Sequence, residues 1–485
     1  MGTDRYTPRS YDDIAPDQRP TLKQALVPVL GLVAFLGLGS AWLGLDPHIP
    51  LVWSIALVGL LGRFVWGYTW EDLYEGIERS LAMGLQAILI LFTIYGVVST
   101  WVAAGTIPTL MYYGLDLLSP QVFLPATALL VGVATFAIGS SWTAVGTLGV
   151  AFIGIGSGLG VPEPMTAGAI LTGAYAGDKQ SPLSDTTNLA AAVTNTDLYD
   201  HIRAMRSGTA VAFGLSLVGF VVLSLGITGT IPADQIAEIQ TALASSYDIT
   251  LLAFLPLAVT FGLAAAGYPA LTVLLAGAFA GAFTSILVQG ASFVTAWQTF
   301  MSGTGPETGS ELVNSLLASG GVSGSAWTIA IVVAALTLGG LLEQTGVLAV
   351  LAHRLQRGIR SPRLLVASTG VSAMLTNALT AQQYMSIVVP GMTLRDTYDE
   401  FGLDSSDLSQ AIESAGTPTG ALLPWHAGGA YMAGVLGVST LQYAPYYMFG
   451  YLSPLVLFAF VLAGVGFSGN SAARPGPAAP ASDDD

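Results

Sequence analysis

Apolar segments separated by short polar ones run along almost the whole chain. Many of them extend for roughly 18 to 25 residues, which is long enough for a helix to cross a hydrocarbon core of about 30 Å. Their hydrophobicity is continuous and lacks the two-residue alternation of a transmembrane barrel strand. The pattern predicts an all-α polytopic membrane protein, with the lipid bilayer as its surroundings.

Polar and helix-breaking residues interrupt several of these segments. Breaks lie at residues 139–141 (Gly-Ser-Ser) and 376–378 (Thr-Asn-Ala), and prolines occur at Pro162, Pro164, Pro182, Pro390, Pro418 and Pro424. Non-helical backbone at membrane depth persists only inside the protein or beside a water-filled cavity. We therefore expect broken helices and re-entrant hairpins.

The interruptions form a weak internal repeat. In each half a polar break is followed, some forty residues later, by a second polar run, at residues 173–191 and 413–433. Placing Pro182 over Pro424, 242 positions later, brings Ser140 and Ser141 close to Gln382 and Gln383. Matching interrupted segments in two halves indicate a transporter whose substrate lies at the repeat interface. The usual consequence is two inverted structural repeats.

The same pattern divides the chain into five parts. We expect a polar cytoplasmic tail (1–22), a first transmembrane half (23–229), an extracytoplasmic loop (230–248), a second transmembrane half (249–466) and a disordered acidic tail (467–485). No Lys or Arg lies between Arg206 and Arg354, whereas Arg354 to Arg363 form a basic cluster. The positive-inside rule then predicts a multi-pass protein of the cell membrane with a cytoplasmic N-terminus.

Composition narrows the function. Only 9% of the residues are charged, and the net charge of −15 sits in the predicted polar segments, as in proteins adapted to high salt. The absence of cysteine excludes disulfides, thiolate metal sites and cysteine nucleophiles. No nucleotide-binding motif is present, so we expect secondary transport with no cofactor beyond the transported ions. We do not expect nucleic acid as a partner, and the sequence leaves open whether the protein forms a homodimer.

Candidate chemistry is concentrated in residues 173–191, which read GAYAGDKQSPLSDTTNLAA. Ionisable groups at membrane depth are functional candidates by default, so we expect Asp178 and Asp185 to bind ions or protons. Neighbouring oxygen donors suit a hard cation. We predict Na⁺ at Asp178, Asp185, Thr187 and Asn188, with support from Lys179, Ser181, Ser184 and Thr186. We expect Lys179 to pair with Asp178 or Asp185.

The other polar breaks supply further candidates. Glu413 is a third expected ion- or proton-binding carboxylate, and the remaining supporting residues are Ser140, Ser141, Thr143, Gln382, Gln383, Tyr384, Thr417, Thr419 and His426. A buried carboxylate can hold H⁺ or Na⁺ but not both, which is the minimal mechanism of an antiporter. Asp197, Asp200 and His201 are predicted to form a solvated cytoplasmic turn.

Several strings of this chain closely resemble the NhaC-type sodium/proton antiporters, a branch of the ion transporter superfamily. They are GSSWTAVGTLGVAFIGI (139–155), GAYAGDKQSPLSDTTNLAA (173–191), TAQQYMSIVVPG (380–391) and ESAGTPTGALLPWHAGGAYMAGVLGV (413–438). The resemblance covers about residues 60–465 and implies two inverted repeats and exchange of Na⁺, or Li⁺, for H⁺. The chain departs from the family at two positions. The family often has Asn where this chain has His426, and it has a Cys nearby where this chain has Ala427.

Other interpretations remain open at this point. Asp178 and Asp185 could simply cap helices in a polar loop. Gly321-Val322-Ser323-Gly324 matches the short GxSG string of rhomboid-type intramembrane proteases, for which His426 would be the base. A related exchanger of an organic anion or amino acid, such as malate for lactate, would call for a membrane-depth arginine, and Arg395 is the candidate.

Overall fold

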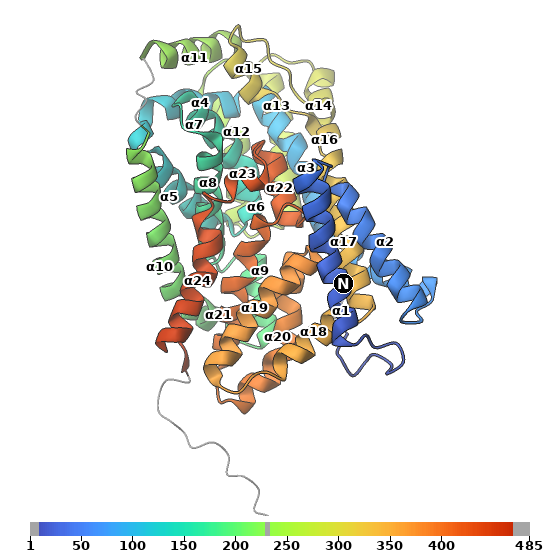
Figure 1. Cartoon of the computed structure of the whole chain (residues 1–485). Coiled ribbons are helices and arrows are strands. Elements are labelled where there is room, and N and C mark those ends of the chain that lie inside the picture. The colour runs from blue at the N-terminus through green and yellow to red at the C-terminus, as the bar shows by residue number, and fades with distance from the viewer. Residues whose placement is uncertain (1–8, 228–232, 469–485) are drawn as a thin grey trace, which may run out of the picture.

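The computed structural model describes residues 9–227 and 233–468, and these contain helices and no β-strand (Figure 1). The first half comprises α1 (Leu22–Leu36), α2 (His48–Phe64), α3 (Trp70–Ala103), α4 (Thr106–Leu117), α5 (Pro120–Ile138), α6 (Ser141–Ala144), α7 (Val150–Gly158), α8 (Glu163–Asp178), α9 (Asp185–Thr194) and α10 (Leu198–Leu225). The connecting region comprises α11 (Ala233–Ser246), α12 (Leu255–Ala265), α13 (Ala270–Leu287), α14 (Phe293–Ser302), α15 (Glu311–Leu317) and α16 (Gly321–Gly324).

The second half begins with α17 and ends with α24. It comprises α17 (Ala326–Gln344), α18 (Val347–Gln356), α19 (Pro362–Thr380), α20 (Gln383–Glu400), α21 (Ser405–Ala415), the short 3₁₀ helix η4 (Thr417–Leu422), α22 (Ala427–Leu436), α23 (Thr440–Tyr443) and α24 (Met448–Ala463). Within the described residues, seven helices are long and apolar enough to cross a membrane, or eight if the bent pair Ile236–Ser246 and Leu251–Ala265 forms one span. The predicted all-α polytopic class is confirmed.

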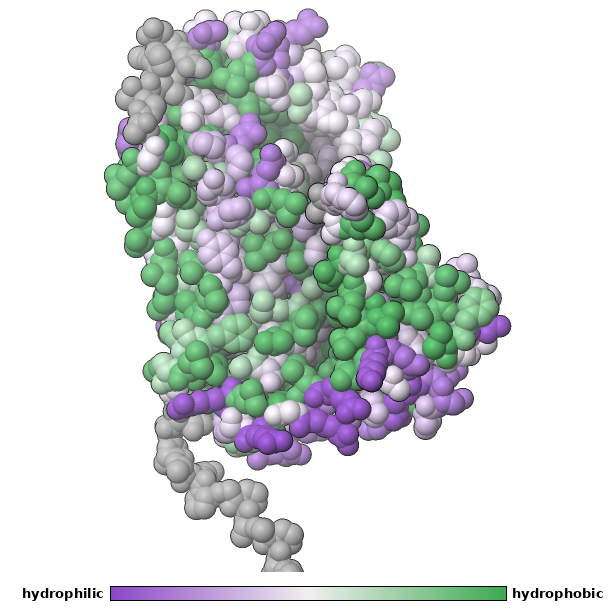
Figure 2. Space-filling view, viewed as in Figure 1, coloured by the Kyte–Doolittle hydropathy of each residue, from purple (hydrophilic) through white to green (hydrophobic). Residues whose placement is uncertain are grey.

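The outer surface is apolar where a membrane would surround it. Figure 2 shows hydrophobic residues along the left side and across the lower half of the visible face, above a hydrophilic lower rim, with further hydrophilic residues at the top. On α10, for example, Val218, Val222 and Leu225 are exposed although each is a large hydrophobe. Such a continuous exposed apolar surface fits lipid rather than water.

The two halves repeat the same element pattern. A shift of 242 positions carries α5 (Pro120–Ile138) onto α19 (Pro362–Thr380) and α9 (Asp185–Thr194) onto α22 (Ala427–Leu436), with identical bounds at both ends. The hairpin arms α7 and α20 lie toward opposite ends of the molecule in Figure 1. The repeat is therefore present in the helix boundaries, while the inverted relation of the halves stays a prediction.

The first predicted break is confirmed. Gly139 ends α5 in the left-handed region with φ 75°, and Ser140 is extended and accepts a hydrogen bond from the Thr143 N–H at 3.2 Å. A Cβ on Gly139 would lie 2.5 Å from Cβ of Leu183, so a side chain fits neither the backbone nor the space. This glycine makes the sharp reversal between α5 and α6.

The second break lies a few residues beyond its predicted place. Residues 376–378 are helical, and α19 ends at Thr380, followed by Ala381 with φ 55° and the extended Gln382. The prediction of a break at 376–378 is wrong because Asn377 meets its hydrogen-bonding demand within a helix, donating from Nδ2 to the Gly416 carbonyl at 2.8 Å. A tertiary contact thus overrides a polar sequence signal.

The expected loop at 230–248 is also different. Residues 228–232 lie outside the described part, but α11 covers Ala233–Ser246 as a helix. Its apolar residues recur at helical spacing, and Ile239 and Leu243 are buried. The predicted acidic tail lies outside the described residues from 469 onward. In the predicted N-terminal tail, Ile14 is buried against the elbow at Gly346 between α17 and α18.

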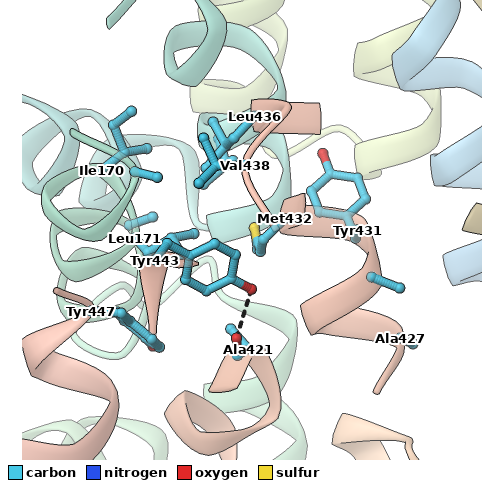
Figure 3. Close-up of a cluster of buried hydrophobic side chains, with 14 of the residues drawn as sticks. Ile170, Leu171, Ala421, Ala427, Tyr431, Met432, Leu436, Val438, Tyr443 and Tyr447 are labelled. Atoms are coloured by element: carbon cyan, nitrogen blue, oxygen red, sulfur yellow. Dashed lines mark hydrogen bonds between the residues drawn. The ribbon is translucent and has the colours of Figure 1, made fainter. Parts of the chain in front are cut away.

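A compact core fixes the second broken region. Figure 3 shows Tyr443, from α23, pointing toward η4, and its hydroxyl donates to the Ala421 carbonyl at 2.7 Å. Met432 and Leu436 from α22 and Ile170 and Leu171 from α8 are buried in the same cluster. This packing holds the break next to α8, which carries the first predicted carboxylate.

Candidate cation-binding site

The two hairpin breaks meet at one small cavity. The first break contributes residues 140–142 and the second residues 382–384, so the two positions that the repeat relates face the same space. The lining residues are Ser140, Ser141, Trp142, Asp178, Asp185, Thr186, Gln382, Gln383 and Tyr384, together with Ala87, Ile90 and Ala270. The sequence predicted eight of these twelve, and Trp142 follows directly after the first predicted break.

Asp178 is held at the C-terminal end of α8. Its Oδ2 accepts hydrogen bonds from the Ser141 backbone N–H at 3.1 Å and from the Ser141 hydroxyl at 2.6 Å. Its Oδ1 is buried and makes no hydrogen bond within the described part of the chain. The carboxylate therefore sits at the N-terminus of the broken segment after Ser140, with one oxygen left for a ligand.

Asp185 occupies the first position of α9, after the cap Ser184. Its Oδ1 accepts from the Thr186 N–H at 2.9 Å, and its Oδ2 accepts from the Tyr384 hydroxyl at 2.5 Å. The residue lies deep in the protein, yet its side chain is exposed to the cavity. Tyr384 comes from the other half, so this hydrogen bond joins the two repeats across the site.

The cavity is negative in character. Two of its lining residues are aspartates, and none of the described residues that line it is Lys or Arg. One wall carries an aromatic pair, because Trp142 stacks on Tyr431 with ring centroids 4.3 Å apart and the Tyr431 hydroxyl donates to the Trp142 carbonyl at 2.6 Å. Two carboxylates among hydroxyls and amides suit a cation and repel an anion.

Glu413 lies behind this cavity rather than in its lining. It is fully buried on α21, and its Oε1 accepts from the Thr186 hydroxyl at 3.1 Å. Its Oε2 makes no hydrogen bond to a described residue. Thr186 itself lines the cavity, so one hydroxyl separates the third carboxylate from the two aspartates.

Lys179 does not pair as predicted. The salt bridges of the described residues, His48–Asp46, Arg79–Glu75 and Arg203–Asp200, do not include it. Its Nζ donates to the hydroxyls of Ser414 at 2.9 Å and Ser453 at 3.1 Å, on α21 and α24. Consecutive helical residues point in different directions, so Lys179 turns away from Asp178. The charge that acts on it is that of Glu413.

This arrangement predicts a cost for removing the lysine. Lys179→Met removes the positive charge that acts on the buried Glu413 and the hydrogen bonds to Ser414 and Ser453, and we therefore expect a lower free energy of unfolding. The double variant Lys179→Met/Glu413→Gln should recover part of the loss, because both charges are then gone. Thermal unfolding of the purified variants in detergent measures both effects. Strict additivity of the two single changes would contradict the coupling.

The remaining predicted residues shape the breaks from outside the cavity. Ser184 caps α9, Asn188 donates to the carbonyls of Pro182 and Ser184, and the Ser181 hydroxyl accepts from the Leu183 N–H. Thr143 donates to Ser140, and Thr419 donates to the Ala415 carbonyl. The hydroxyls of Thr187 and Thr417 are buried and have no hydrogen bond within the described residues. Of the four predicted Na⁺ ligands, only Asp178 and Asp185 line the cavity.

His426 holds the second break together. Its Nδ1 accepts from the Gly428 N–H at 2.9 Å, and its Nε2 lies 2.6 Å from Oδ1 of Asn377. These contacts correspond to the neutral ring with its proton on Nε2. Both nitrogens are thus occupied away from Ser323, which argues against the protease interpretation. Arg395, on α20, donates to the Val193 carbonyl on α9 and is not among the described residues that line the cavity, so it does not supply an anion site there.

The sequence analysis did not identify His201 as a buried titratable residue. His201 was expected in a solvated turn, but it is fully buried in the first turn of α10, with Nδ1 2.8 Å from the Ser409 hydroxyl. The expectation was wrong because Asp197 caps α10 and Asp200 pairs with Arg203, so these polar neighbours mark a helix start. Helical spacing could have indicated it, since Met205 and Thr209 on the same face are buried too.

Known proteins resemble this chain over most of its length. The model of the Na⁺/H⁺ antiporter family matches residues 173–465. The arginine/ornithine antiporter ArcD of Halobacterium salinarum is 52% identical over 455 residues, which cover 93% of this chain and 94% of the relative.

Two further relatives carry other substrate names. The Na⁺/H⁺ antiporter NhaC of Alkalihalophilus pseudofirmus is 36% identical, with 87% of this chain and 92% of the relative covered. The malate-2H⁺/Na⁺-lactate antiporter of Bacillus subtilis is 37% identical, with 88% of this chain and 91% of the relative covered. All three relatives are named antiporters, and their names give different exchanged substrates.

Proposed function

The chain belongs to the Na⁺/H⁺ antiporter family, and on this premise we propose that it is a secondary antiporter that exchanges Na⁺ for H⁺ across the cell membrane. The observation that carries the proposal is the cavity where the two hairpin breaks meet, which Asp178 and Asp185 line and to which no basic side chain of the described residues contributes. Such a site binds cations. The basic cluster from Arg354 to Arg363 supports a cytoplasmic N-terminus.

Exchange follows from competition for the carboxylates. With Na⁺ in the cavity, Oδ1 of Asp178 and the oxygens of Asp185 supply negative charge and direct ligands, while Ser141 and Tyr384 hold the two carboxylates in place. When a proton occupies a carboxylate, that charge is neutralised and the cation loses its main attraction. Because Asp185 and Tyr384 come from different halves, release of their hydrogen bond allows the halves to move apart.

A cationic amino acid is the second candidate substrate. The relative that is 52% identical is named an arginine/ornithine antiporter. The cavity also offers features that a bare ion does not need, namely the Trp142 ring and the side-chain amides of Gln382 and Gln383. A guanidinium or ammonium group would meet the aspartates and stack on the aromatic wall. A malate-type anion is disfavoured by the same two carboxylates.

Transport by the purified protein in vesicles decides between these candidates. Vesicles that contain a pH-sensitive dye are challenged in turn with Na⁺, Li⁺, K⁺, arginine and malate, and radioactive arginine uptake is measured against internal ornithine. Na⁺-driven proton flux without arginine uptake is the expected result. Arginine–ornithine exchange without a Na⁺-driven pH change would replace the leading proposal by the second one.

A further inference from the structure

Buried titratable groups continue from the cavity toward one end of α10. That end carries Arg203 and Arg206 and is therefore the cytoplasmic end by the positive-inside rule. Resting on the proposed exchange of Na⁺ for H⁺, we propose that protons reach the cavity by a path of their own, in which His201 passes protons between the cytoplasmic end of α10 and Glu413.

The first step of the path is His201 itself. α10 starts at Leu198, and Tyr199 and Asp200 beside the imidazole are exposed. His201 is nevertheless fully buried, and its Nε2 makes no hydrogen bond within the described residues. An imidazole can accept a proton on one nitrogen and release one from the other, which a fixed cap or packing residue does not need to do. Its position one turn inside the helix end places it next to the cytoplasm.

The second step leads along α21. Ser409, the hydrogen-bond partner of His201, and Glu413 are four residues apart, so they share one face of the helix with a rise of about 6 Å between them. Lys179 contacts the same helix, because its Nζ donates to the hydroxyl of Ser414, the neighbour of Glu413, at 2.9 Å. Of the charged groups on α5, α8, α9, α21 and α24, which pack against α10, only Lys179 acts on His201 among the described residues.

The third step enters the cavity. Glu413 Oε1 accepts from the Thr186 hydroxyl, and Thr186 lines the cavity together with Asp185. His201, Glu413 and Thr186 therefore succeed one another from the cytoplasmic end to the cavity. Each of these side chains can hold or transfer a proton at an oxygen or nitrogen atom, and the transfer requires no metal ion beside the side chain.

Lys179 explains why the path is selective for protons. Its ammonium group is fully buried and held by Ser414 and Ser453 between the two ends of the path. A fixed positive charge there disfavours a second cation such as Na⁺ and also a lasting imidazolium at His201, so His201 accepts a proton on one nitrogen and releases one from the other without staying charged. Cations and protons would thus enter one cavity by different routes.

His201→Gln tests the path with two measurements on the same vesicles. Glutamine can keep a hydrogen bond to Ser409 but cannot carry a proton, so Na⁺-driven proton flux should fall at least roughly tenfold, as removal of a proton-transfer group does. Exchange of radioactive Na⁺ for unlabelled Na⁺ needs no proton and should stay within about twofold of the unmodified protein. The matched control is His353→Gln, at a histidine on α18 outside the path, which should change neither flux.

Each outcome has a consequence. Loss of proton flux with retained Na⁺ for Na⁺ exchange supports the path. Equal loss of both fluxes would assign His201 a purely structural role and overturn it, and so would retention of both. If His201→Gln does not fold, His201→Asn provides the same comparison, and Glu413→Gln, at the next group of the path, must show the same separation of the two fluxes. An unmodified protein without Na⁺-driven proton flux would overturn the proposed function, and the path with it.

Discussion

Asp185→Asn should abolish Na⁺-driven proton flux, by roughly a hundredfold or more, while leaving a folded protein. The amide keeps the shape of the side chain, and its oxygen can still accept from the Thr186 N–H that the carboxylate now binds. Its amide group can still meet the Tyr384 hydroxyl. What it loses is the charge that attracts a cation and the ability to hold a proton, and exchange needs both.

The measurement is the pH-dye assay in vesicles, with thermal unfolding in detergent as the check on folding. Asp399→Asn serves as the matched control, because Asp399 is an exposed carboxylate near the end of α20 and lies outside the cavity lining. It should transport like the unmodified protein. Near-normal exchange by Asp185→Asn would remove Asp185 from the proposed mechanism.

The fold was largely predictable because hydrophobic length and helix breaks are local signals. Gly139 predicts a reversal from its own chemistry, and the structure shows that reversal at a backbone angle that favours glycine. Asn377 gave the wrong position for the second break, because whether a polar residue ends a helix depends on its partner, here the Gly416 carbonyl. That partner lies 39 positions away, and a single sequence does not reveal it.

The candidate site was predicted less completely, for a geometric reason. The polar run at 173–191 was expected to act as one unit, yet neighbouring residues in it face different spaces. Asp178 faces Ser141 in the cavity, whereas Lys179 faces α21 and α24. Sequence order gives the residue types of a site but not the direction in which each side chain leaves its helix.

The same limit explains how His201 was missed. Its polar neighbours Asp197 and Asp200 resemble a solvated turn, although one of them caps α10 and the other pairs with Arg203 on its surface. The buried face appears only when the helical period is followed through Met205 and Thr209. A cluster of polar residues in the sequence therefore does not by itself distinguish a functional region from an ordinary helix end. The helical spacing of the buried residues helps to tell the two apart.

The cavity has to meet two opposing requirements. A site with two carboxylates in close reach of one ligand binds a cation firmly, and an antiporter must also release it on the other side. Protonation resolves the conflict, since each proton delivered to Asp178 or Asp185 removes one unit of the charge that holds the cation. A path that brings protons from the cytoplasmic end would then act as the release mechanism on that side.

Competition at a shared carboxylate predicts how Na⁺ affinity depends on pH. Where the empty site is protonated, each unit by which pH falls should raise the apparent Na⁺ dissociation constant about tenfold for one displaced proton. The affinity should level off at high pH, where no proton has to leave. The scarcity of other carboxylates near the cavity supports a shared site, because only Asp178 and Asp185 line it and Glu413 lies one hydroxyl away.

Isothermal calorimetry of Na⁺ binding in buffers of different ionisation enthalpy counts the protons released for each bound ion. About one proton per Na⁺ is expected at pH values where the dissociation constant changes tenfold per unit, and none where it is constant. Asp185→Asn should bind Na⁺ weakly and release no proton, whereas Asp399→Asn should behave like the unmodified protein. If the Na⁺ affinity stays constant from about pH 5 to about pH 9 and no proton is released, Na⁺ and H⁺ do not compete for one site. That result would contradict the shared carboxylate and favour transport in which the two ions are not coupled by competition.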